Sequence, residues 1–193
     1  MITLIIGLLL FLGPHSVRIF AEDWRNRQIK QRGANVWSGI YSIISIIGFV
    51  LIVHGYSETR LNPTVIWVPP EWLKYIAAIV LLPTFVLLLA AYIPGTKIKA
   101  LSGHPMSASV KLWGLAHLLA NGNLGDIVLF GSFMMWAIFD YRASRQRDKK
   151  AGIKYPASGI SRDIVVSAIG IGLWIAFVMF LHEWLIGVKP FTW

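Results

Sequence analysis

Apolar and polar positions alternate along this chain in long blocks, a pattern typical of membrane-spanning helices. Six hydrophobic stretches, separated by polar segments, fall at residues 1–20, 37–56, 72–93, 106–120, 124–141 and 163–187. A spanning helix needs about 20 apolar residues, with tolerance down to about 17. The fourth stretch is shorter than this. We therefore expect it to be tilted, re-entrant or extended through Ser102–Pro105.

The composition indicates the same class. Of the 193 residues, 56% are hydrophobic and 14% are charged, whereas a soluble domain carries about 25% charged residues. We predict an all-α polytopic membrane protein with about six transmembrane helices, formed by a single domain over residues 1–193. The chain has no cysteine, which excludes disulfides, cysteine metal ligands and thiol nucleophiles.

The net charge of +9 is explained by the membrane rather than by nucleic acid. Of the 18 lysines and arginines, all but Arg60, Lys74 and Lys189 fall on one side of the predicted bundle. The positive-inside rule places that side in the cytoplasm and both termini outside. We interpret the clusters Arg25–Arg32 and Arg142–Lys154 as topology determinants and contacts for anionic lipids. No nucleic-acid partner is expected.

His15 is the first candidate functional residue, because an ionisable side chain at membrane depth is costly and is seldom placed there without a role. Pro14 precedes it and can kink the helix, which opens space beside the imidazole. Arg18 lies three residues later and so shares its helix face. Imidazole is a common ligand for haem iron and other metals. The structural alternative is a histidine that hydrogen-bonds a neighbouring carbonyl.

His117 is the second candidate, and it is the centre of a polar stripe on an apolar helix. The stripe repeats at helical spacing through Val110, Trp113, His117 and Asn121. A structural histidine bonded to Asn121 or to a facing helix is the alternative to a ligand.

In the last span, the four-residue repeat of Ala168, Gly172 and Ala176 predicts a close helix contact.

The other three histidines have weaker signals. His104 precedes Pro105 at a predicted cytoplasmic helix start, where it can act as a cap, a proton acceptor or an alternative ligand. His54 and His182 lie near the external ends of their spans. We interpret both as interfacial residues.

Two motifs identify a family. The segments GPHSVR (13–18) and GHPMSASVKLWGLAHLLANGNLGDIVLFGSFMMWAIFD (103–140) resemble the NnrU family of bacterial membrane proteins. In length, span count and motif order, the resemblance covers essentially the whole chain. It implies a multi-pass protein of the bacterial cytoplasmic (inner) membrane, associated with nitrite and nitric oxide metabolism in denitrification. The domain is also similar to that of the plant 15-cis-ζ-carotene isomerases (Z-ISO), which bind haem b between two histidines.

This resemblance implies a cofactor and its ligands. Haem b is expected between His15 and His117, with His104 as the alternative metal ligand. Trp113 and Asn121 lie beside His117 in the cofactor-binding set, and Arg18 and Lys111 are expected to hold the haem propionates on the cytoplasmic side. The isomerases are thought to exchange one axial histidine for a cysteine three residues earlier. That position is Gly114 here, so this exchange is excluded.

Helix geometry leaves the ligand pair open. At about 1.5 Å per residue, the depths of His15 and His117 differ by about 10 Å. Depth alone pairs His15 with His104, and His117 with His54 or His182, whereas motif order favours His15 with His117. Two alternatives to a haem protein of nitrogen-oxide metabolism also remain. One is a haem-dependent cis-trans isomerase of a carotenoid or another apolar polyene or lipid. The other is a non-catalytic accessory protein with structural histidines.

Overall fold

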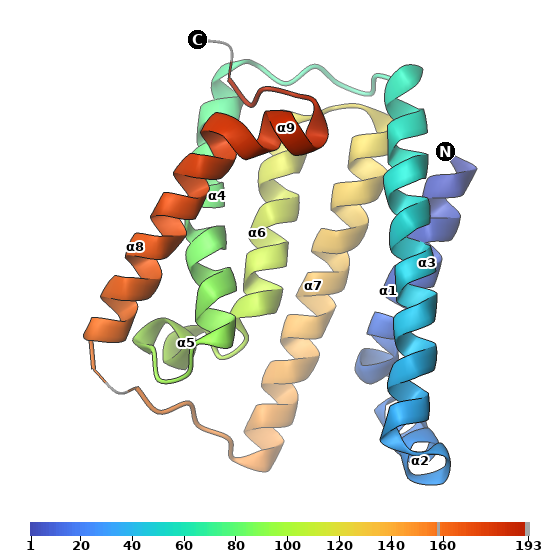
Figure 1. Cartoon of the computed structure of the whole chain (residues 1–193), viewed down its shortest axis with the longest axis vertical. Coiled ribbons are helices and arrows are strands. Elements are labelled where there is room, and N and C mark those ends of the chain that lie inside the picture. The colour runs from blue at the N-terminus through green and yellow to red at the C-terminus, as the bar shows by residue number, and fades with distance from the viewer. Residues whose placement is uncertain (158, 192–193) are drawn as a thin grey trace.

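The computed structural model describes residues 1–157 and 159–191. In it, the chain runs six times between the two ends of a helical bundle (Figure 1). The main helices are α1 (Ile2–Phe20), α3 (Ala34–Leu61), α4 (Trp72–Tyr92), α6 (Pro105–Ala120), α7 (Leu124–Ala151) and α8 (Ser161–Ala176). No strand forms among the described residues, and the all-helical class is confirmed. The last passage continues from α8 through the π-helical turn η1 (Phe177–Leu181) into α9 (His182–Ile186).

Five helical segments within the described residues are long and apolar enough to cross a membrane. They are α1, α3, α4, α7 and the continuous helix of residues 161–186. The helix α6 runs between the same two ends (Figure 1) but has 16 residues, or about 24 Å of length against a hydrocarbon core of about 30 Å. It begins at Pro105 and is not extended backwards, because Gly103, at φ 70°, ends the preceding helix α5 (Lys97–Ser102). The structure therefore confirms five candidate spans, and the sixth remains a prediction.

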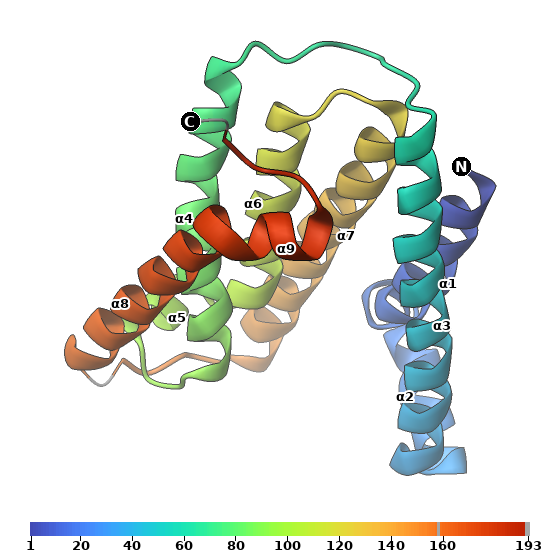
Figure 2. The ribbon, with the colours of Figure 1, turned by 45° about the horizontal axis from the view of Figure 1, so that its top comes forward.

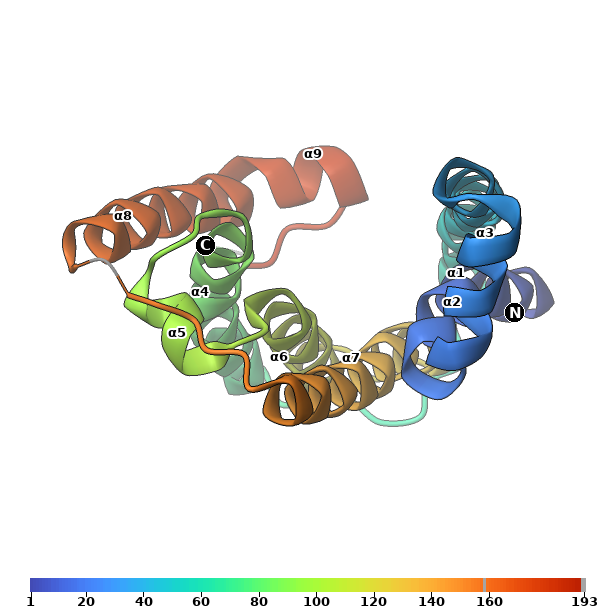
Figure 3. The same cartoon turned by 90° about the horizontal axis from the view of Figure 1, so that it is seen from below.

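The helices stand in a curved row, which Figure 3 shows from below. The order of neighbours along the row is α8, α4, α6, α7, α1 and α3. At one end of the row α1 and α3 meet through glycines: a Cβ on Gly48 would lie 2.5 Å from the backbone nitrogen of Phe11. A core of Leu4, Leu8, Ile52, Leu129 and Phe130 then joins this pair to α7. At the other end of the row, α4 packs against both α6 and α8, and these three helices form a second group.

Charge segregates between the two ends as the sequence predicts. The basic helix α2 (Glu22–Arg32), α5 and the C-terminal end of α7 lie at one end, and both chain termini approach the other (Figure 1). Arg60, Lys74 and Lys189 belong to segments at the end near the termini. Asp163 ties the basic end together, since its carboxylate accepts the backbone N–H groups of Lys97 and Ile98 at the start of α5.

The connection between α3 and α4 arches over the turn between α6 and α7 (Figure 2). The backbone N–H groups of Ile66 and Trp67 donate to the carbonyl of Gly122 at 2.9 and 3.2 Å. A Cβ on Gly122 would lie 1.9 Å from the carbonyl oxygen of Trp67, so only glycine fits this approach. The end of α6, and with it the position of His117, is therefore anchored to the α3–α4 connection.

The small-residue repeat expected in the last span does not make the helix contact within this chain. Gly172 has no atom within 4 Å of a built Cβ, and Ala168 is exposed. Gly170 lies against α4 instead, where its Cβ would come within 2.8 Å of Val86. The contact face of α8 follows Asp163, Val166 and Gly170, which are its buried residues.

Candidate functional site

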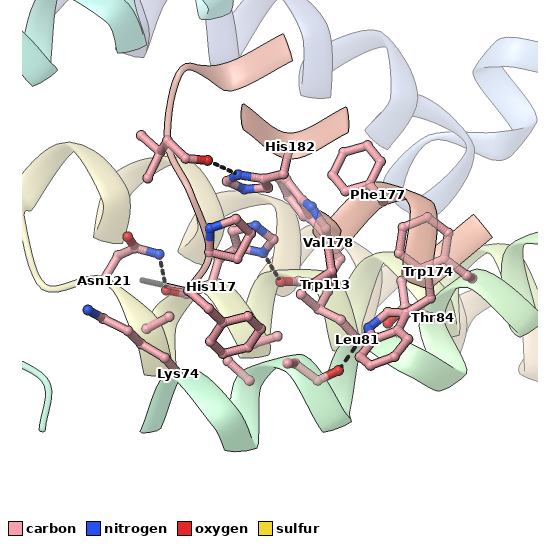
Figure 4. A pocket seen from close by; sticks show the side chains of 18 of the residues that line it. Lys74, Leu81, Thr84, Trp113, His117, Asn121, Trp174, Phe177, Val178 and His182 are labelled. Atoms are coloured by element: carbon pink, nitrogen blue, oxygen red, sulfur yellow. Dashed lines mark hydrogen bonds between the residues drawn. The ribbon is translucent and has the colours of Figure 1, made fainter. Parts of the chain in front are cut away.

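A cavity lies within the group of α4, α6, α8 and α9. It measures about 510 Å³, within the range of roughly 300–1,000 Å³ that is usual for small-molecule sites. One wall is a face of α4 that runs from Lys74 through Leu81 to Leu88, and the opposite walls come from α6, α8 and η1. Its interior is mostly apolar, and Trp113, Trp174 and Phe177 contribute aromatic rings to it (Figure 4).

The stripe predicted on α6 lines this cavity. Val110, Trp113, His117 and Asn121 all face it. The His117 Nδ1 bonds the carbonyl oxygen of Trp113 at 2.8 Å, and its ring stacks on Phe130 of α7 with a centroid distance of 4.4 Å. The Asn121 side-chain amide donates to the carbonyl oxygen of His117 at 2.8 Å. The imidazole is therefore held in one orientation by its own helix and by α7.

A second histidine reaches the same cavity from the far end of the chain. His182 follows directly on η1, and π-helical turns often occur at functional sites. Its Nδ1 bonds the carbonyl oxygen of Val188 at 2.7 Å. The rings of His182 and His117 lie 6.5 Å apart between centroids, with their planes inclined by 20° (Figure 4). The Nε2 atom of neither ring has a hydrogen-bond partner among the described residues.

The mouth of the cavity is polar and partly covered by the C-terminal segment. Lys74, at the start of α4, and Lys189 both line it. Lys189 pairs with the exposed carboxylate of Glu183 at 3.7 Å. Phe191 stacks on Tyr75 with ring centroids 5.2 Å apart, which holds the segment across the start of α4. The cavity thus has a basic opening and an apolar interior.

His15 lies in a different cavity, of about 270 Å³, between α1, α2, α3 and α7. Its Nδ1 bonds the carbonyl oxygen of Phe11 at 2.6 Å, and its ring contacts Tyr41 and Trp136. The cavity is lined by Pro14, His15, Arg18, Arg25, Trp37, Ser38, Tyr41 and Asp140. Its lining is charged and polar, in contrast to the aromatic interior around His117.

The structure does not bring His15 and His117 together. Phe11, Phe133 and Trp113 stand between them as a series of ring contacts, with centroid distances of 5.7 Å for Phe11–Phe133 and 5.6 Å for Phe133–Trp113. Depth alone allows His54 or His182 as the partner of His117, and the structure places His182 beside it.

The two basic residues expected at the propionates lie outside the His117 cavity. Arg18 lines the His15 cavity, where its Nε lies 3.5 Å from the Glu22 carboxylate. The Lys111 ammonium lies over the ring of Tyr141, 5.1 Å from its centroid, and does not line the cavity. Lys74 and Lys189 occupy the basic positions there instead.

The remaining histidines have their Nε2 atoms engaged. His104 Nε2 lies 2.8 Å from the Asp148 carboxylate, and the Tyr155 hydroxyl donates to the same carboxylate at 3.0 Å. Burial, with the hydrogen bond to Asp148 next, raises the pKa of Tyr155. His54 Nε2 lies 3.2 Å from the exposed Glu58. These contacts favour structural roles for both histidines.

Gly114 faces α7 rather than the cavity. A Cβ at this position would lie 2.8 Å from the carbonyl oxygen of Phe130 and 2.8 Å from the Cβ of Met134. Position 114 is therefore a point of close helix packing in this chain.

An all-helical chain with five candidate spans and a ligand-sized cavity between its helices is a multi-pass membrane protein. The model of the NnrU protein family matches residues 3–190, so the chain belongs to the NnrU family. No curated protein and no solved structure matches it.

Proposed function

We propose that this protein binds haem b in the cavity between α4, α6 and α8, where His117 and His182 would hold its iron. The observation that carries the proposal is the pair of nearly parallel imidazoles, with ring centroids 6.5 Å apart, in a mostly apolar cavity. Two imidazoles that ligate one metal through Nε2, at about 2 Å each, have ring centres roughly 6 Å apart. The spacing of the two histidines fits that geometry.

The hydrogen bonds of the two histidines support the same assignment. Metal-bound histidines usually donate the N–H of their other ring nitrogen to a carbonyl or carboxylate, which fixes the tautomer. Here both Nδ1 atoms bond backbone carbonyls, of Trp113 and of Val188. Each Nε2 is thereby left as an acceptor that can bind a ligand. When bound, haem supplies an iron centre for electron transfer or for binding a small molecule.

A haem fits this site better than a bare metal ion does. The described residues contain no group of three or more histidine, aspartate or glutamate side chains placed to hold a metal. A porphyrin brings its own four in-plane ligands, so that two histidines suffice. The walls formed by Phe85, Trp113 and Phe177 match an apolar macrocycle.

The cellular setting follows the family. We infer a location in the bacterial inner membrane, with the basic end of the bundle in the cytoplasm and both termini outside. The same inference associates the protein with nitrite and nitric oxide metabolism. Membrane lipids are its expected surroundings, since large apolar side chains such as Ile43, Phe49 and Ile79 are exposed on the outer faces of α3 and α4.

Two other functions have an observation in their favour. The long apolar interior also suits a carotenoid or another polyene, as in a haem-dependent cis-trans isomerase, although the thiol of the plant enzymes has no counterpart. A non-catalytic accessory role is favoured by the way His117 is already packed on Phe130 and bonded to its own helix.

The visible spectrum of the protein purified in mild detergent tests the proposal. We expect a Soret band and a pyridine haemochrome of haem b in the wild type. His117→Ala should abolish or strongly change this band, whereas His54→Ala, on an exposed helix face, should retain it. A wild-type protein reconstituted with haem that still shows no bound-haem spectrum would favour the accessory role. Bound haem together with isomerisation of an added polyene would favour the isomerase.

A further inference from the structure

The His117 cavity is polar at one end and apolar along the rest of its length. Lys74, Ala77, Ala78, Leu81, Thr84, Phe85 and Leu88 of α4 line it at helical spacing. From Lys74 to Leu88 this face spans about 21 Å, at about 1.5 Å per residue. Lys74, in the first turn of α4, and Lys189 both line the cavity and are exposed, so they mark its mouth. The site is therefore long and has positive charge at one end only.

The two lysines are not neutralised by carboxylates inside the cavity. The Lys74 ammonium has no ion pair or hydrogen bond among the described residues. Lys189 pairs only with Glu183, at 3.7 Å and with both side chains more than half exposed. Exposed pairs of this kind are weak, about 0.2–1 kcal/mol, so a ligand anion can replace Glu183.

We infer that the cavity takes an elongated amphipathic carboxylate, with the carboxylate bound at Lys74 and Lys189 and the apolar body lying along Leu81 to Leu88. For haem b, whose identity as the ligand rests on the function proposed above, the propionates then face the end of the bundle that carries the chain termini. This orientation is opposite to the one expected from Arg18 and Lys111. Charged groups are also less costly at the membrane surface than at its centre, and the mouth is the surface end of the cavity.

The test compares acids with their esters in the full-length protein. In non-ionic detergent, the binding of haem b and of its dimethyl ester is followed in the Soret region. In parallel, cis-parinaric acid and its methyl ester are titrated by fluorescence, which requires no iron ligand. The variant is Lys74→Gln with Lys189→Gln. The control, Lys149→Gln with Lys150→Gln, removes the same charge at the exposed end of α7.

The expected result is that the wild type and the control prefer each acid to its ester. The mouth variant should bind the acids roughly three- to tenfold more weakly and the esters unchanged, as the loss of two partly exposed ion pairs implies. Equal affinity for acid and ester in the wild type, or a larger loss in Arg18→Gln with Lys111→Gln, would overturn the inference. A preference for parinaric acid without any haem binding would remove the haem proposal and leave this inference standing.

Discussion

Gly114→Ala is the substitution that most directly tests how α6 is held beside α7. The added Cβ would lie 2.8 Å from the carbonyl oxygen of Phe130 and 3.3 Å from the Cα of Met134. Both are backbone atoms, so a side-chain rotation cannot relieve the contact and the two helices must separate. His117 lies one turn further along α6 and stacks on Phe130, so the same shift disturbs the candidate ligand.

The magnitude follows from two opposing effects. Overpacking of this kind costs about 1–3 kcal/mol, and replacing a helical glycine by alanine returns about 0.5–1 kcal/mol. Gly131→Ala on α7 is the matched control, because nothing lies within 4 Å of its built Cβ and only the favourable effect remains. The difference between the two variants should therefore be about 1–3 kcal/mol in the free energy of unfolding. For a chain of this length, that corresponds to roughly 3–10 °C in Tm.

Thermal unfolding in detergent micelles measures this difference. The chain has nine tryptophans, which provide an intrinsic fluorescence signal, and no cysteine for a thiol-reactive dye. We expect Gly114→Ala to melt below the wild type and Gly131→Ala at or above it. A Gly114→Ala protein as stable as Gly131→Ala would refute the close approach of α6 and α7, and with it the position of His117.

Three further predictions follow from the same contacts. Gly114→Cys should give the spectrum of Gly114→Ala in haem-loaded protein, because the thiol faces α7; the appearance of thiolate ligation would show that it reaches the cavity. Gln146→Cys should react with an impermeant thiol reagent only after the membrane is permeabilised, and external labelling would reverse the proposed topology. Tyr56→Phe removes a 2.7 Å hydrogen bond to Asp126 and should cost about 1.5–3 kcal/mol in thermal melts. Tyr92→Phe, at an exposed residue, should leave the melting temperature unchanged. Equal melting temperatures of the two tyrosine variants would show that the Tyr56–Asp126 bond does not stabilise the fold.

The path of the chain could be predicted from hydropathy because every apolar block except the fourth is about one membrane thickness long. Hydropathy does not predict the two helices at the basic end, because α2 and α5 are too short or too polar to register as spans. The signal for α2 is the order of its charges. Acidic Glu22 and Asp23 begin it and basic Lys30 and Arg32 end it, as the helix dipole favours.

The candidate site was predictable only as far as it lies on one helix. The stripe of Trp113, His117 and Asn121 is a local pattern, and all three residues line the cavity. The approach of His182 depends on η1 and on a bond to Val188, six residues later in a segment that folds back over the cavity. The helical spacing of the sequence does not predict either the π-helical turn or this folding back of the chain. His182 therefore looked interfacial in the sequence, apart from its agreement in depth with His117.

The sequence could not show, for a related reason, that Arg18 and Lys111 lie outside the His117 cavity. Charge counting assigns residues to a side of the membrane but not to a cavity. Lys111 instead meets the face of Tyr141, a contact between neighbouring helices that the sequence does not indicate. Lys74 and Lys189 come from segments more than 100 residues apart, and only the fold brings them to one mouth.

The coordination state of the iron in haem-loaded protein tests the central claim most directly, because it reports which histidine is paired with His117. His182→Ala should convert a six-coordinate, low-spin spectrum into that of a five-coordinate or weakly ligated haem, and added imidazole should restore it. His15→Ala should leave the spectrum low-spin, because His15 lies in the other cavity. A low-spin spectrum in His182→Ala, together with its loss in His15→Ala, would contradict the pairing of His117 with His182.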